Sequence, residues 1–186
     1  MAVRPAPYRF NVGEYYQMAE AGIFNEDDRV ELLEGEVVEM APIDSRHAGC
    51  VNRLTMVFAE RLEGQAIVAV QKPVRLSQHS EPQPDFALLR PRPDAYGSGH
   101  PGPEDVMLLV EVADTTAAWD RGQKLPLYAA AGVAELWLID LSAAVVEVCR
   151  RPEGVAYLDI RLVGPDDRLA PEAFPDASLL AGDLLA

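Results

Sequence analysis

Apolar and polar positions along the first third of the chain predict two helices with a β-hairpin between them. Residues 12–24, VGEYYQMAEAGIF, carry apolar side chains at helical spacing, and Gly22 is a stop signal. In residues 29–40, RVELLEGEVVEM, two short apolar runs flank a Glu-Gly pair, which is typical of a hairpin with glycine in the turn. Residues 47–64, HAGCVNRLTMVFAERLEG, place their apolar side chains on one stripe and predict an amphipathic helix.

The rest of the chain alternates strand-like and helical patterns. A short helix is predicted in residues 123–132, QKLPLYAAAG, and Pro126 places its beginning close to Gln123, because proline is tolerated best in a first helical turn. The tail, residues 165–186, has no regular pattern and is expected to wrap the core. Strands are predicted in residues 66–77, 84–90, 106–114, 135–141 and 144–150, of which the last two form the final strand pair.

The order of these elements predicts a mixed α/β fold with one central sheet. A helix lies between the strands VMLLVEVA and ELWLIDL, so we expect the two strands to be parallel neighbours. Both are almost entirely apolar, which suits burial on both faces. The length fits a single domain, 1–186, with an N-terminal extension (1–40), a core (41–150) and a C-terminal wrapping segment (151–186).

Composition narrows the possible partners. The chain has thirty acidic and sixteen basic residues, a net charge of −14. This charge repels nucleic acid at long range, so binding of nucleic acid requires a local region of positive charge. Most of these carboxylates are read as a solvated acidic face. Two cysteines make neither a disulfide framework nor zinc-ligand spacing, and they predict buried, reduced thiols. The N-terminus MAVRPAPYRF has no apolar signal region and no stretch reaches membrane-spanning length, so we expect a cytoplasmic protein without a membrane partner.

Two acidic residues lie in or beside predicted apolar strands, where burial of an unpaired carboxylate is unfavourable. Glu111 lies in the middle of the apolar strand VMLLVEVA, and an unpaired carboxylate there would cost several kcal/mol. Asp85 follows Pro84 at the start of the preceding strand, so the two carboxylates can meet. Together with backbone carbonyls they are oxygen ligands suited to Mg²⁺ or Mn²⁺. The plainer alternatives are a Pro-Asp strand start and a Glu111–arginine ion pair.

Lys124 is one of only two lysines in the chain. In the first turn of the predicted helix its charge would oppose the helix dipole, so it is better accommodated facing carboxylates or a bound phosphate. An ordinary surface lysine is the competing interpretation. Asp120 is a weaker candidate for the site, and its plainer interpretation is a helix N-cap, with Gln123 three residues later.

Several motifs together resemble the Uma-type family of restriction endonucleases, within the PD-(D/E)XK nuclease superfamily. The resemblance extends from about Phe10 to Arg150, and each motif is weak alone but specific in this order. The motifs are RVELLEGEVVEM (29–40), HAGCVNRL (47–54), QPD (83–85), HPGPEDVMLLVEVADTT (100–116), which contains LLVEV, and DRGQKLPLYAAAGVAELWLID (120–140).

The resemblance implies an αβββαβ restriction-endonuclease-like core in which Asp85 and Glu111 lie on adjacent strands. The superfamily motif expects lysine two residues after the glutamate, where this chain has Ala113. The family tends to have a small residue there and a lysine on the following helix, which Lys124 matches. Only the position of the ammonium group in space matters for its chemistry.

The implied activity is Mg²⁺- or Mn²⁺-dependent hydrolysis of DNA phosphodiester bonds by a metal-activated water, leaving a 5′-phosphate. Asp85, Glu111 and the Val112 carbonyl would hold the metal, and Lys124 would orient the water or stabilise the transition state. Glu31 is a weaker candidate as a further metal-shell acid, with a surface strand acid as its plainer interpretation.

His47 is a weaker candidate for touching substrate, with a capping or structural role as the alternative. Arg46, Arg53, Arg75 and Arg121 are candidates for a basic lip, although scattered surface arginines are the default. The resemblance also implies a homodimer, because small nucleases of this superfamily commonly cut two strands with two subunits.

Two other functions remain open from the sequence. The net charge and Ala113 favour a catalytically inactive nuclease-fold protein that acts as a binding or regulatory module. A metal-dependent hydrolase of another phosphate ester would use the same residues.

Overall fold

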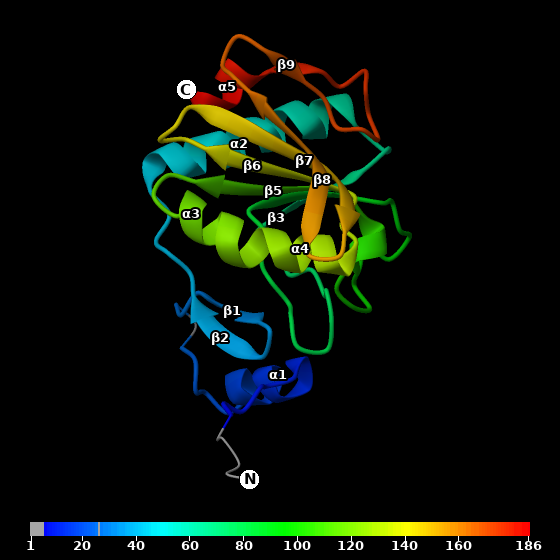
Figure 1. The fold of residues 1–186 in the computed structure, drawn as a ribbon. Coiled ribbons are helices and arrows are strands. Elements are labelled where there is room, and N and C mark those ends of the chain that lie inside the picture. The colour runs from blue at the N-terminus through cyan, green and yellow to red at the C-terminus, as the bar shows by residue number, and fades with distance from the viewer. Residues whose placement is uncertain (1–5, 26) are drawn as a thin grey trace.

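The computed structural model describes residues 6–25 and 27–186 and contains, within them, a six-stranded mixed sheet (Figure 1). The strands lie in the order β3-β4-β5-β6-β7-β8. β5 (Val106–Ala113) and β6 (Glu135–Asp140) are parallel, and the other neighbouring strands are antiparallel. The predicted parallel pair and the αβββαβ order of elements are confirmed. The remaining strands are β3 (Ile67–Val70), β4 (Phe86–Leu89), β7 (Val145–Glu153) and β8 (Ala156–Val163).

Helices cover both faces of this sheet (Figure 1). On one face lies α2 (Ser45–Arg61), which begins two residues before the predicted start because Asp44 caps it by accepting the His47 N–H at 2.9 Å. Its apolar stripe includes Phe58, which is fully buried against the aromatic rings of the sheet at centroid distances of 5.7 and 6.1 Å. The helical segment after β5 covers the other face.

That segment starts earlier than the pattern predicted. It runs as α3 (Ala117–Trp119), a π-helical turn (Asp120–Lys124) and α4 (Leu125–Ala131). The predicted start near Gln123 and the N-cap role of Asp120 are therefore wrong. Asp120 has helical dihedral angles (φ −59°, ψ −44°), and its carboxylate accepts a hydrogen bond from the Thr116 hydroxyl at 2.8 Å.

The position of Pro126 misled the prediction for a physical reason. Proline interrupts the α-helical ladder, but the wider π-turn directly before it accommodates the interruption, with the Leu125 N–H bonded to the Asp120 carbonyl five residues back. The helix can therefore pass through the proline instead of beginning there.

The N-terminal region adds α1 (Val12–Glu20) and the hairpin β1 (Val30–Leu33) and β2 (Glu36–Glu39), as predicted. Glu34 and Gly35 both have positive φ (49° and 78°), as the tight turn of such a hairpin requires. The hairpin lies beside the sheet domain (Figure 1), where the Glu81 N–H donates to the Leu32 carbonyl at 2.7 Å.

The C-terminal segment is more regular than predicted. β7 continues to Glu153, and β8 follows as a sixth strand, so residues 135–150 are not the last strand pair. Residues 158–162, LDIRL, alternate apolar and polar positions, which is the signal of a half-buried strand that the prediction missed. The tail forms the short pair β9 (Arg168–Leu169) and β10 (Leu179–Leu180) and the helix α5 (Ala181–Leu185), which packs on α2.

The two cysteines are buried and unpaired, as predicted, on opposite faces of the sheet. Among the described helices, none has the length and hydropathy needed to cross a bilayer. Residues 1–5, which belong to the N-terminal stretch without an apolar signal region, and Glu26 lie outside the described residues.

Candidate active site

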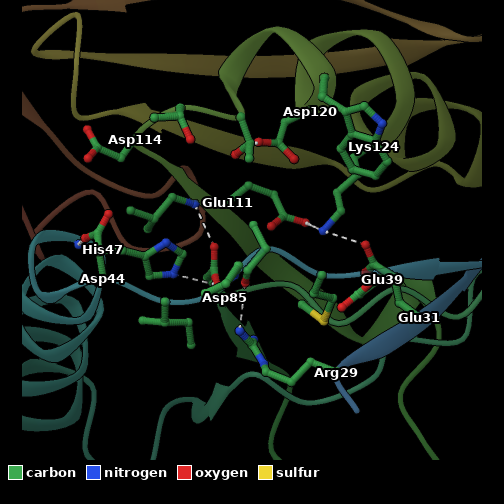
Figure 2. A pocket seen from close by; sticks show the side chains of 18 of the residues that line it. Arg29, Glu31, Glu39, Asp44, His47, Asp85, Glu111, Asp114, Asp120 and Lys124 are labelled. Carbon is green, nitrogen blue, oxygen red and sulfur yellow. Dashed lines mark hydrogen bonds and ion pairs between the residues drawn. The ribbon is translucent and has the colours of Figure 1, made fainter. Parts of the chain in front are cut away.

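A pocket of about 310 Å³ opens where β4 and β5 separate, between the sheet, α2 and the β1–β2 hairpin (Figure 2). The structure brings all seven sequence-predicted site residues into its wall. They are Glu31, His47, Asp85, Glu111, Val112, Asp120 and Lys124.

Asp85 lies directly before β4 and is almost fully buried. The β4–β5 ladder ends at the Phe86–Val110 pair, so the peptide of Val112 extends beyond it, and the Val112 N–H donates to Asp85 Oδ2 at 2.9 Å. The N–H and carbonyl of one strand residue face the same side, so the Val112 carbonyl also faces the end of β4. The Asp85 carboxylate and the Val112 carbonyl thus lie side by side in the wall of the pocket.

His47 holds the other oxygen of Asp85. Its Nε2 lies 2.8 Å from Asp85 Oδ1 (Figure 2). Burial disfavours the imidazolium, but the hydrogen bond and negative charge of Asp85 outweigh it and raise the pKa of His47. The side chain thus orients a site carboxylate, and the start of α2 sets its position.

Glu111 projects from the middle of β5 and is 3% exposed. Its Oε1 accepts a hydrogen bond from the Tyr128 hydroxyl at 2.6 Å and lies 3.3 Å from Lys124 Nζ. Burial, together with neighbouring carboxylates and against the effect of Lys124, raises the pKa of Glu111 to about 8. The pocket therefore disfavours the ionised form of Glu111, and Lys124 offsets this effect only in part.

Lys124 points into the pocket and is 5% exposed. Its ammonium lies 3.1 Å from Glu31 Oε1 and 3.3 Å from Glu111 Oε1 (Figure 2). Burial disfavours the charged form, but the nearby acids more than offset it and raise the pKa of Lys124. The lysine thus stays charged and faces carboxylates, and it is not a surface lysine.

Glu31 reaches the pocket from β1 and is buried, so its plainer interpretation as a surface strand acid is wrong. One of its oxygens binds Lys124, and the other accepts the Gln83 N–H at 3.0 Å. The hairpin is therefore part of the site wall. Nothing in the local pattern around Glu31 could indicate this, because its partners lie 52 and 93 positions later in the chain.

Two functional contacts were missed in the sequence. Tyr128 lies four residues after Lys124, and this spacing places both side chains on one helical face. That spacing was an available signal. Gln83, in the QPD motif, donates its backbone N–H to Glu31 and its side-chain amide to the Val30 carbonyl at 3.1 Å, which no local pattern indicates.

None of the four arginines proposed for a basic lip lines the pocket, where the arginine is Arg29, and each of the four binds a partner within the described chain. Arg46 pairs with Asp114 at 2.9 Å, and Arg121 with Asp140 at 2.8 Å. The other two also bind internally: Arg53 to the carbonyls of Leu184 and Ala186, and Arg75 to Glu81.

The donor set fits a divalent cation of the Mg²⁺ type. Four buried carboxylates line the pocket with one lysine, one histidine and Arg29. A bound cation would stabilise the ionised form of Glu111, whose pKa is raised by burial and by the neighbouring carboxylates. Among the described residues no group of three or more His, Cys, Asp or Glu side chains forms a metal cage. Mg²⁺ seldom uses such cages, because it binds one or two carboxylates and keeps several waters.

Comparisons with known proteins show the family and the fold of this chain. The Uma2 family model, described as "Putative restriction endonuclease", matches residues 12–182. A crystal structure described as "a putative nuclease belonging to DUF820" from Anabaena variabilis ATCC 29413 has a TM-score of 0.71 at 16% identity, covering 95% of this chain and 97% of that one. No protein with a curated description matches. Since the family model spans most of the chain, the protein belongs to the Uma2 family, and it has a nuclease fold.

Proposed function

We propose that this protein is a Mg²⁺-dependent endonuclease that hydrolyses DNA phosphodiester bonds. The observation that carries the proposal is the convergence of Asp85, Glu111 and the Lys124 ammonium in one pocket, with 3.3 Å between the lysine and Glu111. Membership of a nuclease family supports the reaction class.

Asp85, Glu111 and the Val112 carbonyl would hold Mg²⁺ or Mn²⁺. When bound, such a metal supplies Lewis-acid polarisation of a phosphoryl oxygen and lowers the pKa of water. The chain's own residues fix these ligands: His47 and the Val112 N–H orient Asp85, and Tyr128 orients Glu111. Ligand orientation by such partners commonly contributes tenfold or more to metal affinity.

Lys124 supplies the positive charge that the reaction needs at the phosphate. Its ammonium is buried and held charged, so it can donate hydrogen bonds to phosphate oxygens as negative charge develops. Ala113 occupies the usual strand position of this lysine and is fully buried, which leaves the ammonium from the helix as the cation beside Glu111.

The first experiment is calorimetric titration of the wild type and Asp85→Asn with MgCl₂ and MnCl₂. Binding to the wild type and its loss in the variant would support the metal site. Asp94→Asn is a matched control, because Asp94 is an aspartate in an exposed loop away from the pocket. Absence of binding to the wild type would contradict the proposal and favour the inactive nuclease-fold binding module.

The second experiment is cleavage of supercoiled plasmid DNA by the wild type, Lys124→Met and Lys72→Met. Lys72 is exposed and is the only other lysine, so its variant controls for the loss of one positive charge. We expect Lys124→Met to lose cleavage while Lys72→Met retains it, with thermal melts to verify folding. Metal binding without DNA cleavage in the wild type would contradict the substrate assignment and favour another phosphate ester.

A further inference from the structure

β8 forms one edge of the sheet. Within residues 6–25 and 27–186, the ladder of strands ends at β8, so its outer backbone groups have no strand beside them. Leu158, Ile160 and Leu162 alternate along it and are 56%, 54% and 66% exposed. Proteins that stay monomeric usually protect an edge with charges, proline, bulges or short strands. An eight-residue edge with three exposed apolar side chains is therefore suited to pairing.

The other face of β8 carries a pair of opposite charges. Asp159 and Arg161 are both exposed and flank Ile160 on either side. Successive strand residues point to opposite faces, so these two share the face away from the leucines. One donor of the Arg161 guanidinium reaches the Arg168 carbonyl at 3.2 Å, and a guanidinium carries five donors in all.

We propose that β8 is the interface with a second copy of this chain, in which the two β8 strands pair antiparallel about a two-fold axis at Ile160. Asp159 then faces the partner's Arg161, and Arg161 faces the partner's Asp159. On the opposite face, Leu158 packs against the partner's Leu162. Such directly opposed pairs have Cβ atoms about 4.5–5.5 Å apart.

Symmetry fixes this register. A two-fold axis perpendicular to the sheet keeps each side chain on its own face, so the axis must pass through a residue of the strand and not between two residues. An axis at Asp159 would place two aspartates opposite each other, and an axis at Arg161 would place two arginines together. Only the axis at Ile160 pairs opposite charges, so the strand is self-complementary in one register.

The proposed interface is independent of the proposed catalysis. β8 lies three strands away from β5, which carries Glu111, so each copy keeps a complete pocket. Variants in β8 can therefore be tested for assembly while metal binding to each chain reports that the fold is intact.

The test is sedimentation velocity of the wild type, Asp159→Arg and Arg161→Asp. Each single change sets like charges opposite each other twice, and we expect the dimer dissociation constant to rise about tenfold or more. In an equimolar mixture of the two variants, a heterodimer again pairs opposite charges, so dimerisation should return to the wild-type affinity. The double variant D159R/R161D should also dimerise.

Met56→Lys is the control, because Met56 is exposed on α2, whose main contacts with the sheet are with β3, β4 and β5. It should leave the dimer unchanged. The proposal is overturned if the wild type sediments as a monomer at high micromolar concentration. It is also overturned if the single variants dimerise as tightly as the wild type, or if their mixture stays monomeric.

Discussion

At the scale of single residues, the pocket concentrates more negative than positive charge. Lys124 is shared between Glu31 and Glu111, so neither carboxylate has a cation of its own. Asp85 instead relies on His47 and a backbone N–H. Buried charges of this kind cost several kcal/mol unless they are paired, and a proton or a divalent cation can supply what is missing.

Glu111→Gln is expected to change how stability depends on pH. The pKa of Glu111 is raised from 4.5 to about 8, so the folded state binds its proton more tightly than the unfolded state. Stability of the metal-free wild type should therefore fall as pH rises from about 4.5 to about 8 and then level off. The variant lacks this loss and should be more stable than the wild type at pH 9, by an amount on the order of a few kcal/mol.

Urea unfolding in EDTA at pH 5 and pH 9 measures this effect. Glu60→Gln is the control, because Glu60 is exposed on α2. The groups facing Glu111 are Lys124, Tyr128 and the carboxylates of Asp85, Glu31 and Asp120, and they are unchanged in both variants. Parallel pH profiles for the wild type and Glu111→Gln would contradict the prediction.

Tyr128→Phe tests whether the hydroxyl positions Glu111. It removes a fully buried 2.6 Å hydrogen bond to a carboxylate and should destabilise the protein by about 1.5–3 kcal/mol. Mg²⁺ affinity should fall by about tenfold, because a ligand loses its orienting partner. Tyr157→Phe is a matched control: its hydroxyl donates to the Val133 carbonyl at 3.0 Å outside the pocket, so metal affinity should not change. Equal calorimetric affinities for the two variants would argue against the positioning role.

At the scale of elements, the helical run from Ala117 to Ala131 decides where the lysine goes. Its π-turn covers Asp120 to Lys124 and ends where α4 begins. A π-turn inserts an extra residue and so changes which face a side chain occupies, and such turns are frequent at functional sites. The strand that carries Glu111 and the helix that carries Lys124 thereby present their charges to each other.

Two glycines in this run should respond oppositely to alanine. Gly122 lies in the π-turn without positive φ, and a Cβ there would meet no atom within 4 Å. Gly122→Ala should therefore stabilise the protein by about 0.5–1 kcal/mol. Gly132 ends α4 with φ +83°, so Gly132→Ala should destabilise it by about 1–2 kcal/mol. Chemical denaturation at pH 7 compares the two, and a destabilising Gly122→Ala would show that the turn requires glycine.

At the scale of the whole molecule, the net charge of −14 opposes compactness and DNA binding together. The arginines proposed as phosphate contacts are held by internal partners, so they do not offset this charge at the pocket. A divalent cation would act on this protein in two ways, by screening charges over the whole surface and by binding in the pocket.

Thermal melts can separate these two effects. NaCl should raise the melting temperature modestly by screening surface repulsion. MgCl₂ at the same ionic strength should add stability equal to RT ln(1 + [Mg²⁺]/Kd), about 2.7 kcal/mol at 100 times Kd. For a chain of this size that corresponds to a further increase of several degrees. Asp85→Asn should keep the NaCl effect and lose the Mg²⁺-specific part. If both salts act equally on the wild type, the site does not bind Mg²⁺.

Local sequence determined much of the fold. The hairpin, α1, α2 and the buried parallel strands were predictable because their apolar spacing and turn residues act over only a few positions. The positions of Asp85 and Glu111 were also visible, since acids beside or within apolar strands are conspicuous. β8 was missed although residues 158–162 alternate apolar and polar positions as a strand does, whereas the exposure of its apolar side chains could be seen only in the structure.

Tertiary structure decided how the pocket is completed. The local pattern placed Lys124 in a first helical turn and Asp120 at a cap, but the helix starts after Thr116 and turns the lysine inward. Glu31 and His47 reach the pocket from segments that are far in sequence from their partners Lys124 and Asp85. Spacing in a sequence specifies the face of one helix or strand, whereas contacts between distant segments depend on how those elements pack. The sequence alone thus determined most of the elements and two of the acids, and only packing decided which charges meet.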